Sequence, residues 1–165
     1  MGRFLLLLLL FFCAITASAQ HANTGDTPIV VKQLPKEGFV LDRGWKFTAV
    51  DNPSFADPAY DDQNWQPIDP TKDIHDLPQL WKGIGWLRMH FTIDSAIIGS
   101  LAMQIQQSGA SEMYLNGKLL KRYGIISTQP NKIVAYDPWG KPVPLQFNQP
   151  GNNVLDQQRK GCLQP

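Results

Sequence analysis

Residues 85–94 read Gly-Trp-Leu-Arg-Met-His-Phe-Thr-Ile-Asp, and this stretch decides the fold class of the chain. Successive side chains of an extended strand point to opposite faces of a sheet. One face carries only apolar side chains, those of Leu87, Met89, Phe91 and Ile93. The other face carries Trp86, Arg88, His90 and Thr92. The alternation predicts a β-strand with one face in a core and the other toward solvent.

Short alternating runs of the same kind recur on both sides of this stretch, separated by Gly, Pro, Asn and Asp clusters. Met113 and Leu115 alternate before Asn116-Gly117, and apolar residues resume at Leu119 or Leu120. Asn-Gly suits a type I′ hairpin turn, which needs positive φ at both central residues. Residues 52–64 are expected to form a loop with at most one helical turn. Further strands are predicted at residues 29–34, 45–49, 101–105, 133–136 and 143–147. About eight short strands predict an all-β fold, a β-sandwich or jelly roll.

The first 19 residues have the pattern of an export signal. Arg3 provides a positive start, residues 4–12 are an unbroken apolar run, and Ala17-Ser18-Ala19 provides a small-residue cleavage site. The apolar run is shorter than the ~20 residues that a membrane-spanning helix requires, which argues against a retained anchor. We therefore expect an exported protein, periplasmic or secreted, cleaved near Ala19.

Composition excludes several classes of partner. Of 165 residues, 15 are Lys or Arg and 14 are Asp or Glu, so the loss of Arg3 with the leader leaves a balanced chain. In such a chain no excess of basic residues argues for nucleic acid, and no excess charge argues for anionic lipid. Cys13 belongs to the leader, which leaves Cys162 without a partner for an internal disulfide.

Motifs that carry catalysis are missing from the sequence. Glutamate occurs only at Glu37 and Glu112, so the sequence does not indicate a pair of carboxylates across a cleft. It also lacks the G-x-S-x-G, H-E-x-x-H and CxxC motifs. We expect a noncatalytic protein without a cofactor or metal. Asp69, Asp73 and Asp76 could offer oxygen ligands to Ca²⁺, but an ordinary turn explains them better.

The aromatic residues and the aspartates of the predicted loops suggest separate roles. Sugar-binding proteins use exposed aromatic rings as stacking surfaces. Trp81 and Trp139 lie next to glycine-containing turns and are the main candidates for ligand contact, together with His75 and Tyr136. The remaining candidates have structural roles. Trp45 and Trp65 are expected in the core, Asp61 and Asp62 are expected to order the turn before Trp65, and Arg88 is expected to pair with one of these aspartates at the surface. The structural set is Trp45, Asp61, Asp62, Trp65, Trp86, Arg88, Asn116 and Gly117.

Five motifs in order resemble a known family. They are Gly44-Trp45-Lys46-Phe47, Tyr60-Asp61-Asp62-Gln63-Asn64-Trp65, Gly83-Ile84-Gly85-Trp86-Leu87-Arg88, residues 111–118 and Gly151-Asn152-Asn153-Val154-Leu155. This succession resembles the galactose-binding-domain-like jelly roll, best known as the sugar-binding domain of family 2 glycoside hydrolases. The resemblance covers residues 38–155, with residues 20–37 as a lead-in strand. It implies a noncatalytic β-sandwich, because such enzymes carry their acid and nucleophile on separate domains.

A closer similarity is to the periplasmic N-terminal region of Bacteroidota-type sensor histidine kinases. Residues 34–38, 68–78 and 108–112 carry it. The main functional prediction is therefore a sensory ectodomain that binds a carbohydrate or another small ligand and that reaches a membrane only through downstream segments. The alternatives are a carbohydrate-binding domain of a family 2-like glycoside hydrolase and a free-standing secreted binding module. The sequence does not indicate the oligomeric state.

Residues 156–165 depart from the family pattern. They contain only two apolar side chains, where the family has an alternating apolar strand. We therefore expect a jelly roll that lacks its last strand, followed by a tail foreign to the domain, in a truncated or frameshifted chain.

Overall fold

The computed structural model describes residues 28–72 and 83–161, and the predicted leader lies outside these residues. The described chain is built from strands and single 3₁₀ turns. The strands are β1 (Ile29–Val31), β2 (Trp45–Thr48), β3 (Gln66–Ile68), β4 (Ile84–Ile93), β5 (Gly99–Met103), β6 (Gly109–Leu115), β7 (Lys118–Tyr123), β8 (Val143–Phe147) and β9 (Gly151–Gly161). The 3₁₀ turns are η1 (Pro53–Ala56), η3 (Ser95–Ile97) and η4 (Pro130–Lys132). Within the described ranges, no helix has the length and apolar character needed to cross a membrane.

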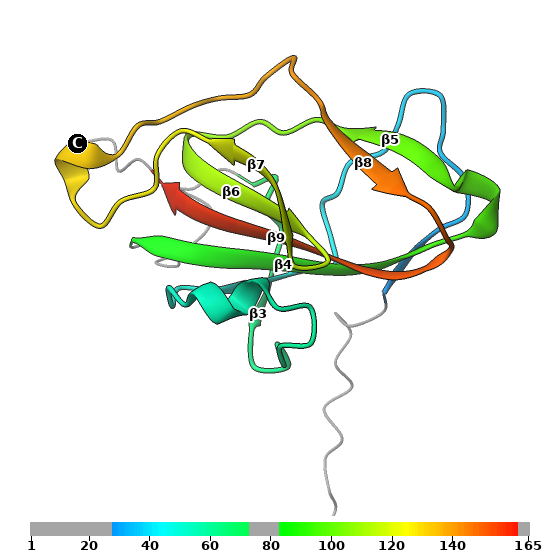
Figure 1. Cartoon of the computed structure of the whole chain (residues 1–165), viewed down its shortest axis with the longest axis horizontal. Helices are drawn as coiled ribbons and strands as arrows, with labels where there is room; N and C mark the ends of the chain where they lie inside the picture. The colour runs from blue at the N-terminus through cyan, green and yellow to red at the C-terminus, as the bar shows by residue number, and fades with distance from the viewer. Residues whose placement is uncertain (1–27, 73–82, 162–165) are drawn as a thin grey trace, which may run out of the picture.

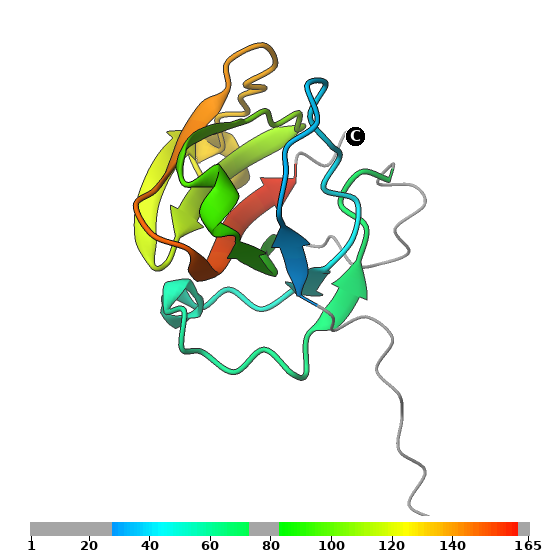
Figure 2. The same cartoon turned by 90° about the vertical axis from the view of Figure 1, so that its right-hand side faces the viewer.

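The strands form two sheets. A seven-stranded sheet has the order β3-β2-β4-β9-β6-β7, with β1 pairing in parallel with the second half of β4. The other sheet contains β5 and β8, which lie above the larger sheet in Figure 1 and in the turned view of Figure 2. The prediction of an all-β, jelly-roll type β-sandwich is confirmed.

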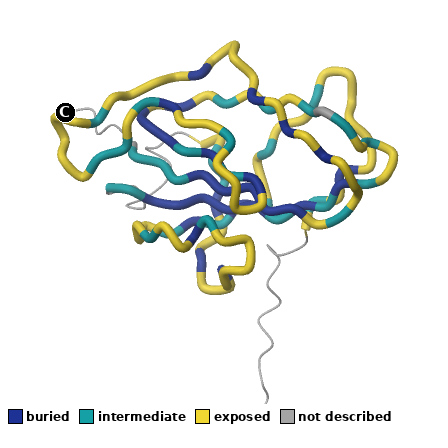
Figure 3. Tube along the Cα trace, viewed as in Figure 1, coloured by how far each residue is buried: buried dark blue, intermediate teal, exposed yellow. Residues whose placement is uncertain are grey.

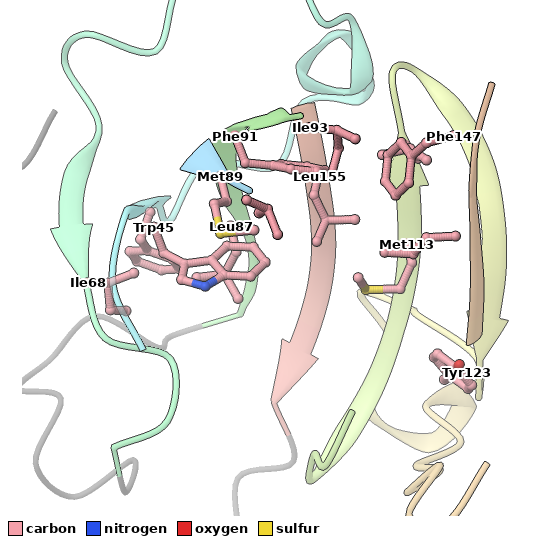
Figure 4. Close-up of a cluster of buried hydrophobic side chains, with 14 residues drawn as sticks. Trp45, Ile68, Leu87, Met89, Phe91, Ile93, Met113, Tyr123, Phe147 and Leu155 are labelled. Atoms are coloured by element: carbon pink, nitrogen blue, oxygen red, sulfur yellow. The ribbon is translucent and has the colours of Figure 1, made fainter. Parts of the chain in front are cut away.

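The main core fills the space between the two sheets. The apolar residues predicted on one face of β4 are all buried there, and Leu87 and Ile93 are almost completely inaccessible. Leu155 from β9, Met113 from β6 and Phe147 from β8 point into the same space (Figure 4). The tube in Figure 3 is accordingly buried along β4 and β9 and exposed along most connecting loops. The alternation in residues 85–94 therefore predicted the centre of the core correctly.

The hairpin between β6 and β7 turns at Asn116-Gly117. Both residues have positive φ, 50° at Asn116 and 79° at Gly117, which confirms the predicted turn. The Asn116 side chain also donates from Nδ2 to Asn153 Oδ1 at 2.8 Å, and its Oδ1 accepts from Val154 N at 2.9 Å. This one side chain therefore ties the hairpin to β9 as well as favouring the turn.

The structure corrects the prediction for the end of the chain. Strand β9 continues beyond Leu155 to Gly161 and lies between β4 and β6, in the middle of the large sheet. The predicted boundary after Leu155 and the missing strand are therefore wrong for residues 156–161. Polar side chains fit here because they meet buried polar partners: Arg88 Nε donates to Asp156 Oδ1 at 2.6 Å, and Gln157 Nε2 donates to Gln107 Oε1 at 3.0 Å.

The second face of β4 is also covered, contrary to prediction. Residues 53–65, which contain η1 and are called the covering segment below, lie beneath β4 in Figure 1. Phe55 and Trp65 of this segment form a second small core with Trp86. One further expectation fails, because residues 133–136 form only an isolated bridge, Ile125 to Val134. Strand β3, which pairs with β2, was not among the predicted strands.

Arg88 holds this covering segment on the sheet. Its side chain is fully buried and pairs with Asp156, whereas a surface pair with Asp61 or Asp62 was predicted. Its guanidinium also donates to three main-chain carbonyls of the covering segment: Tyr60 O at 2.9 Å, Asp57 O at 2.9 Å and Phe55 O. A buried charge is tolerated only where it is paired and hydrogen-bonded. The ion pair therefore explains why polar residues sit at the centre of both strands.

Candidate ligand-binding site

A groove with a volume of about 410 Å³ opens between β7 and the segment that leads into β8. It brings together Tyr136, one of the predicted ligand contacts, and basic residues from both sides. Its lining is Lys121, Arg122, Tyr123, Gly124, Tyr136, Lys141, Pro142, Val143 and Pro144. Two segments that are separate in the sequence, residues 121–124 and 136–144, therefore meet at this edge of the sandwich.

The segment beside the groove is held by a tight network. Tyr136 N donates to Gly109 O at 2.8 Å, and Gln107 Nε2 donates to Tyr136 O at 3.0 Å. Asp137 Oδ1 accepts from Trp139 N at 3.1 Å, an Asx-type contact that orders the turn. These bonds fix the backbone on both sides of Trp139.

Trp139 is presented to solvent on this ordered turn. Pro138 before it is fully buried, and Lys141 N closes the turn by donating to Pro138 O at 2.8 Å. Gly140 adopts a φ of 72°, which a glycine reaches without steric cost. The Trp139 side chain remains 62% exposed. A large apolar ring on a well-anchored turn suits contact with a ligand, because little conformational entropy is lost on binding.

Tyr136 forms one wall of the groove. Its ring stacks on Tyr123, with centroids 6.0 Å apart and planes inclined by 10°. Lys141 Nζ donates to its hydroxyl at 2.7 Å. This hydrogen bond and the charge interaction with Tyr136 raise the pKa of Lys141, so this side chain stays positively charged at neutral pH. The ring is therefore fixed in place and has an ammonium group at its edge.

The groove is positively charged. Arg122 is balanced by Glu112, whose Oε1 accepts from Arg122 Nε at 2.7 Å. Lys121 and Lys141 form no ion pair with an acidic side chain within residues 28–72 and 83–161. Carboxylate, histidine and hydroxyl nucleophile pairs are missing from the described lining. The arrangement therefore offers aromatic stacking and positive charge to a ligand.

Tyr136 is the one predicted ligand contact that the described residues place in the groove lining. Trp81, His75, Asp73 and Asp76 lie outside the described residues. Asp69 Oδ1 accepts from both Thr71 N and Thr71 Oγ1, the bonds of an ordinary turn. The described residues hold no group of three His, Cys, Asp or Glu side chains placed for a metal ion.

The structural candidates lie in the two cores, at the covering segment and, for Asn116 and Gly117, in the turn between β6 and β7. Trp45 and Trp65 are buried, and Asp61 Oδ1 accepts from Gln63 N at 3.0 Å in the turn before Trp65. Asp62 instead contacts the sheet: its carboxylate lies 2.6 Å from His90 Nε2 and 3.2 Å from Lys46 Nζ. Burial acts to raise the pKa of Asp62, but the hydrogen bond and charge of His90, with Lys46, hold that pKa below its ordinary value.

Comparison with known proteins gives only distant likenesses. No protein-family model matches the chain, and no curated protein matches it. A Bacteroides uniformis beta-glucuronidase 2 is 18% identical, with a TM-score of 0.48 over 72% of this chain and 14% of that chain. A beta-glycosidase from Bacteroides vulgatus is 24% identical, with a TM-score of 0.43 over 70% and 16%. A glycosyl hydrolase family 2 member from Bacteroides cellulosilyticus is 19% identical, with a TM-score of 0.49 over 74% and 18%.

The chain thus spans less than a fifth of the length of these three glycosidases. Likeness at this level does not assign their activities or ligands to this chain. The resemblance to sensor-kinase ectodomains finds no support in these matches and stays a prediction.

Sequence reasoning missed the basic residues of the groove. Lys121 lies in β7 and Lys141 follows the Trp139 turn, 20 positions later. Nothing in their local sequence signals that they share a groove, since the fold alone brings the two segments together. The one available signal was the position of Lys141 immediately after an aromatic turn.

Proposed function

We propose that this chain is a noncatalytic carbohydrate-binding β-sandwich domain, with Trp139 and Tyr136 as the aromatic contacts for the sugar. The observation that carries the proposal is the exposed Trp139 ring on a turn whose backbone is fixed on both sides. The exposure of so large an apolar ring to water is unfavourable, and the C–H faces of a sugar provide a matching apolar surface that would cover it. Lys141, two residues after Trp139, lines the groove, whose volume of about 410 Å³ is large enough for a sugar unit.

The proposal assigns no chemical step to the domain. Binding of this kind needs stacking and a few hydrogen bonds, which Tyr136 and Lys141 provide. The sensory role at the front of a histidine kinase stays a prediction from resemblance, and no contact in the described part of the chain favours it over simple carbohydrate binding.

A glycan array followed by titration of the best glycan tests the proposal. Trp139→Ala should weaken binding about tenfold, since a stacked aromatic contact contributes about 1.5 kcal/mol. Phe39→Ala is the control, because Phe39 is an exposed aromatic residue in the segment between β1 and β2, far in the sequence from the Trp139 turn. Equal affinity of the wild-type chain and Trp139→Ala, at an unchanged melting temperature, would contradict the proposal.

A further inference from the structure

The lysines of the groove specify the ligand further. Lys121 and Lys141 lie on opposite sides of the groove, one from β7 and one from the segment before β8. Within the described ranges neither forms an ion pair. Asp137 is the acidic residue nearest in sequence to Lys141, but its carboxylate accepts from Trp139 N and from Gln107 N at 3.4 Å. The positive charge of the groove is therefore available to a ligand.

Lys141 lies at the hydroxyl end of the Tyr136 ring. Its Nζ is 2.7 Å from the Tyr136 hydroxyl and 5.2 Å from the centre of the Tyr136 ring. A lysine ammonium has three donors, and the hydrogen bond to Tyr136 uses one of them. A sugar that covers the ring would thus place its substituents beside the two remaining donors.

We propose that the groove selects acidic carbohydrates, whose carboxylate or sulfate groups pair with Lys121 and Lys141 while the sugar stacks on Tyr136 and Trp139. This inference rests on the proposed function and adds the chemical class of the ligand. The chain as a whole has a formal net charge of only +1. Selection for acidic glycans would therefore come from this groove and not from a general positive surface.

The test uses the purified chain and three oligosaccharides of equal length. Tetragalacturonate carries carboxylates, a carrageenan-type tetrasaccharide carries sulfates, and galactotetraose is neutral. Isothermal titration should show at least one acidic probe binding about fivefold or more tightly than the neutral one, because exposed charge pairs contribute up to about a factor of five each. The preference should shrink as salt rises from about 0.02 M to about 0.5 M, where exposed charges are screened.

Matched variants separate the groove from general electrostatics. Lys121→Gln and Lys141→Gln should each weaken acidic binding roughly fivefold, and more than they weaken neutral binding, while Lys141→Arg should keep the acidic preference. The double variant Lys118→Gln/Lys132→Gln removes two positive charges, one more than either groove variant, but both residues lie outside the groove lining, so it should have no effect.

Three distinct results would overturn the inference. Equal binding of neutral and acidic probes, still sensitive to Trp139→Ala, would reject the acidic preference and leave the proposed function standing. Failure of all three probes and of every glycan on the array to bind would reject the proposed function together with the inference. An acidic preference that Lys118→Gln/Lys132→Gln weakens as much as the groove variants would also reject it.

Discussion

Replacing Arg88 by methionine should destabilise the domain strongly while leaving the groove in place. The change removes the hydrogen bond at 2.6 Å to Asp156 and three bonds to carbonyls of the covering segment. Asp156 Oδ2 already has no partner among the described residues, so the variant leaves a buried carboxylate with no cation. Removing one member of a buried ion pair costs about 3–5 kcal/mol. Against a typical total of about 5–15 kcal/mol, much of the stability is lost.

Urea unfolding followed by tryptophan fluorescence measures this loss, and a fall of roughly 10–20 °C in melting temperature should accompany it. Arg122→Met is the matched control, because the Arg122 side chain is 65% exposed in its pair with Glu112 and should matter by less than about 1 kcal/mol. Arg88→Met/Asp156→Leu should recover more than half of the loss, since apolar replacement of both partners removes the unpaired charge. The reasoning would be refuted if Arg88→Met lowered the free energy of unfolding by less than about 1 kcal/mol. It would also be refuted if the loss in Arg88→Met/Asp156→Leu equalled the sum of the losses in the two single variants.

The cost of Arg88→Met should also grow with pH. Burial raises the pKa of Asp156 to about 6 in spite of Arg88. When the pKa of a carboxyl group is higher in the folded than in the unfolded state, the free energy of unfolding falls as pH rises from the unfolded-state pKa to the folded-state pKa. In the wild-type chain this fall is complete above about pH 6. Without Arg88 the folded-state pKa of Asp156 is higher still, so the fall continues to higher pH. The variant should therefore be more strongly destabilised at pH 8 than at pH 6.

Three further changes test other parts of the structure. Trp65→Ala should cost about 3–5 kcal/mol of unfolding free energy through the cavity it leaves beside Phe55, and calorimetry with glycan titration should show lower stability at unchanged affinity. Gly124→Ala should destabilise the loop between β7 and β8, because φ is 75° and the new Cβ would lie 2.0 Å from Val134 O; faster proteolysis there is the expected readout, and an unchanged rate would contradict it. The lowered pKa of Asp62 means that its stabilising contribution is present above the ordinary value of 3.8 and is lost as pH falls through the folded-state pKa; Asp62→Asn should flatten the acid limb of an unfolding curve measured against pH, and an unchanged limb would count against this.

The strands that face the main core could be predicted because the alternation of apolar and polar residues within each strand indicates which face is buried. The alternation in β4 and the Asn116-Gly117 turn needed no long-range information. Strand β9 could not be predicted in full, because residues 156–161 are polar and become acceptable in the core only through partners such as Arg88 and Gln107. A prediction of burial from apolar residues alone misses strands whose polar side chains are buried against polar partners.

The candidate site was predicted in part for a similar reason. Trp139 and Tyr136 could be chosen from sequence, since an aromatic residue in a Pro-Gly turn is often exposed. Lys121 and Lys141 could not, because their shared groove exists only once β7 and the segment before β8 are brought side by side. Arg88 and Trp86 were placed on an exposed face because the covering segment around η1 has too little periodicity to be recognised as a packing partner.

Titration of the purified chain and of Trp139→Ala with a glycan selected on an array shows whether the exposed Trp139 ring binds carbohydrate. The wild-type chain should bind measurably, Trp139→Ala should bind about tenfold more weakly, and the two should have equal melting temperatures. Binding that is unaffected by Trp139→Ala, or the absence of binding to any glycan by a folded chain, would contradict the proposed function.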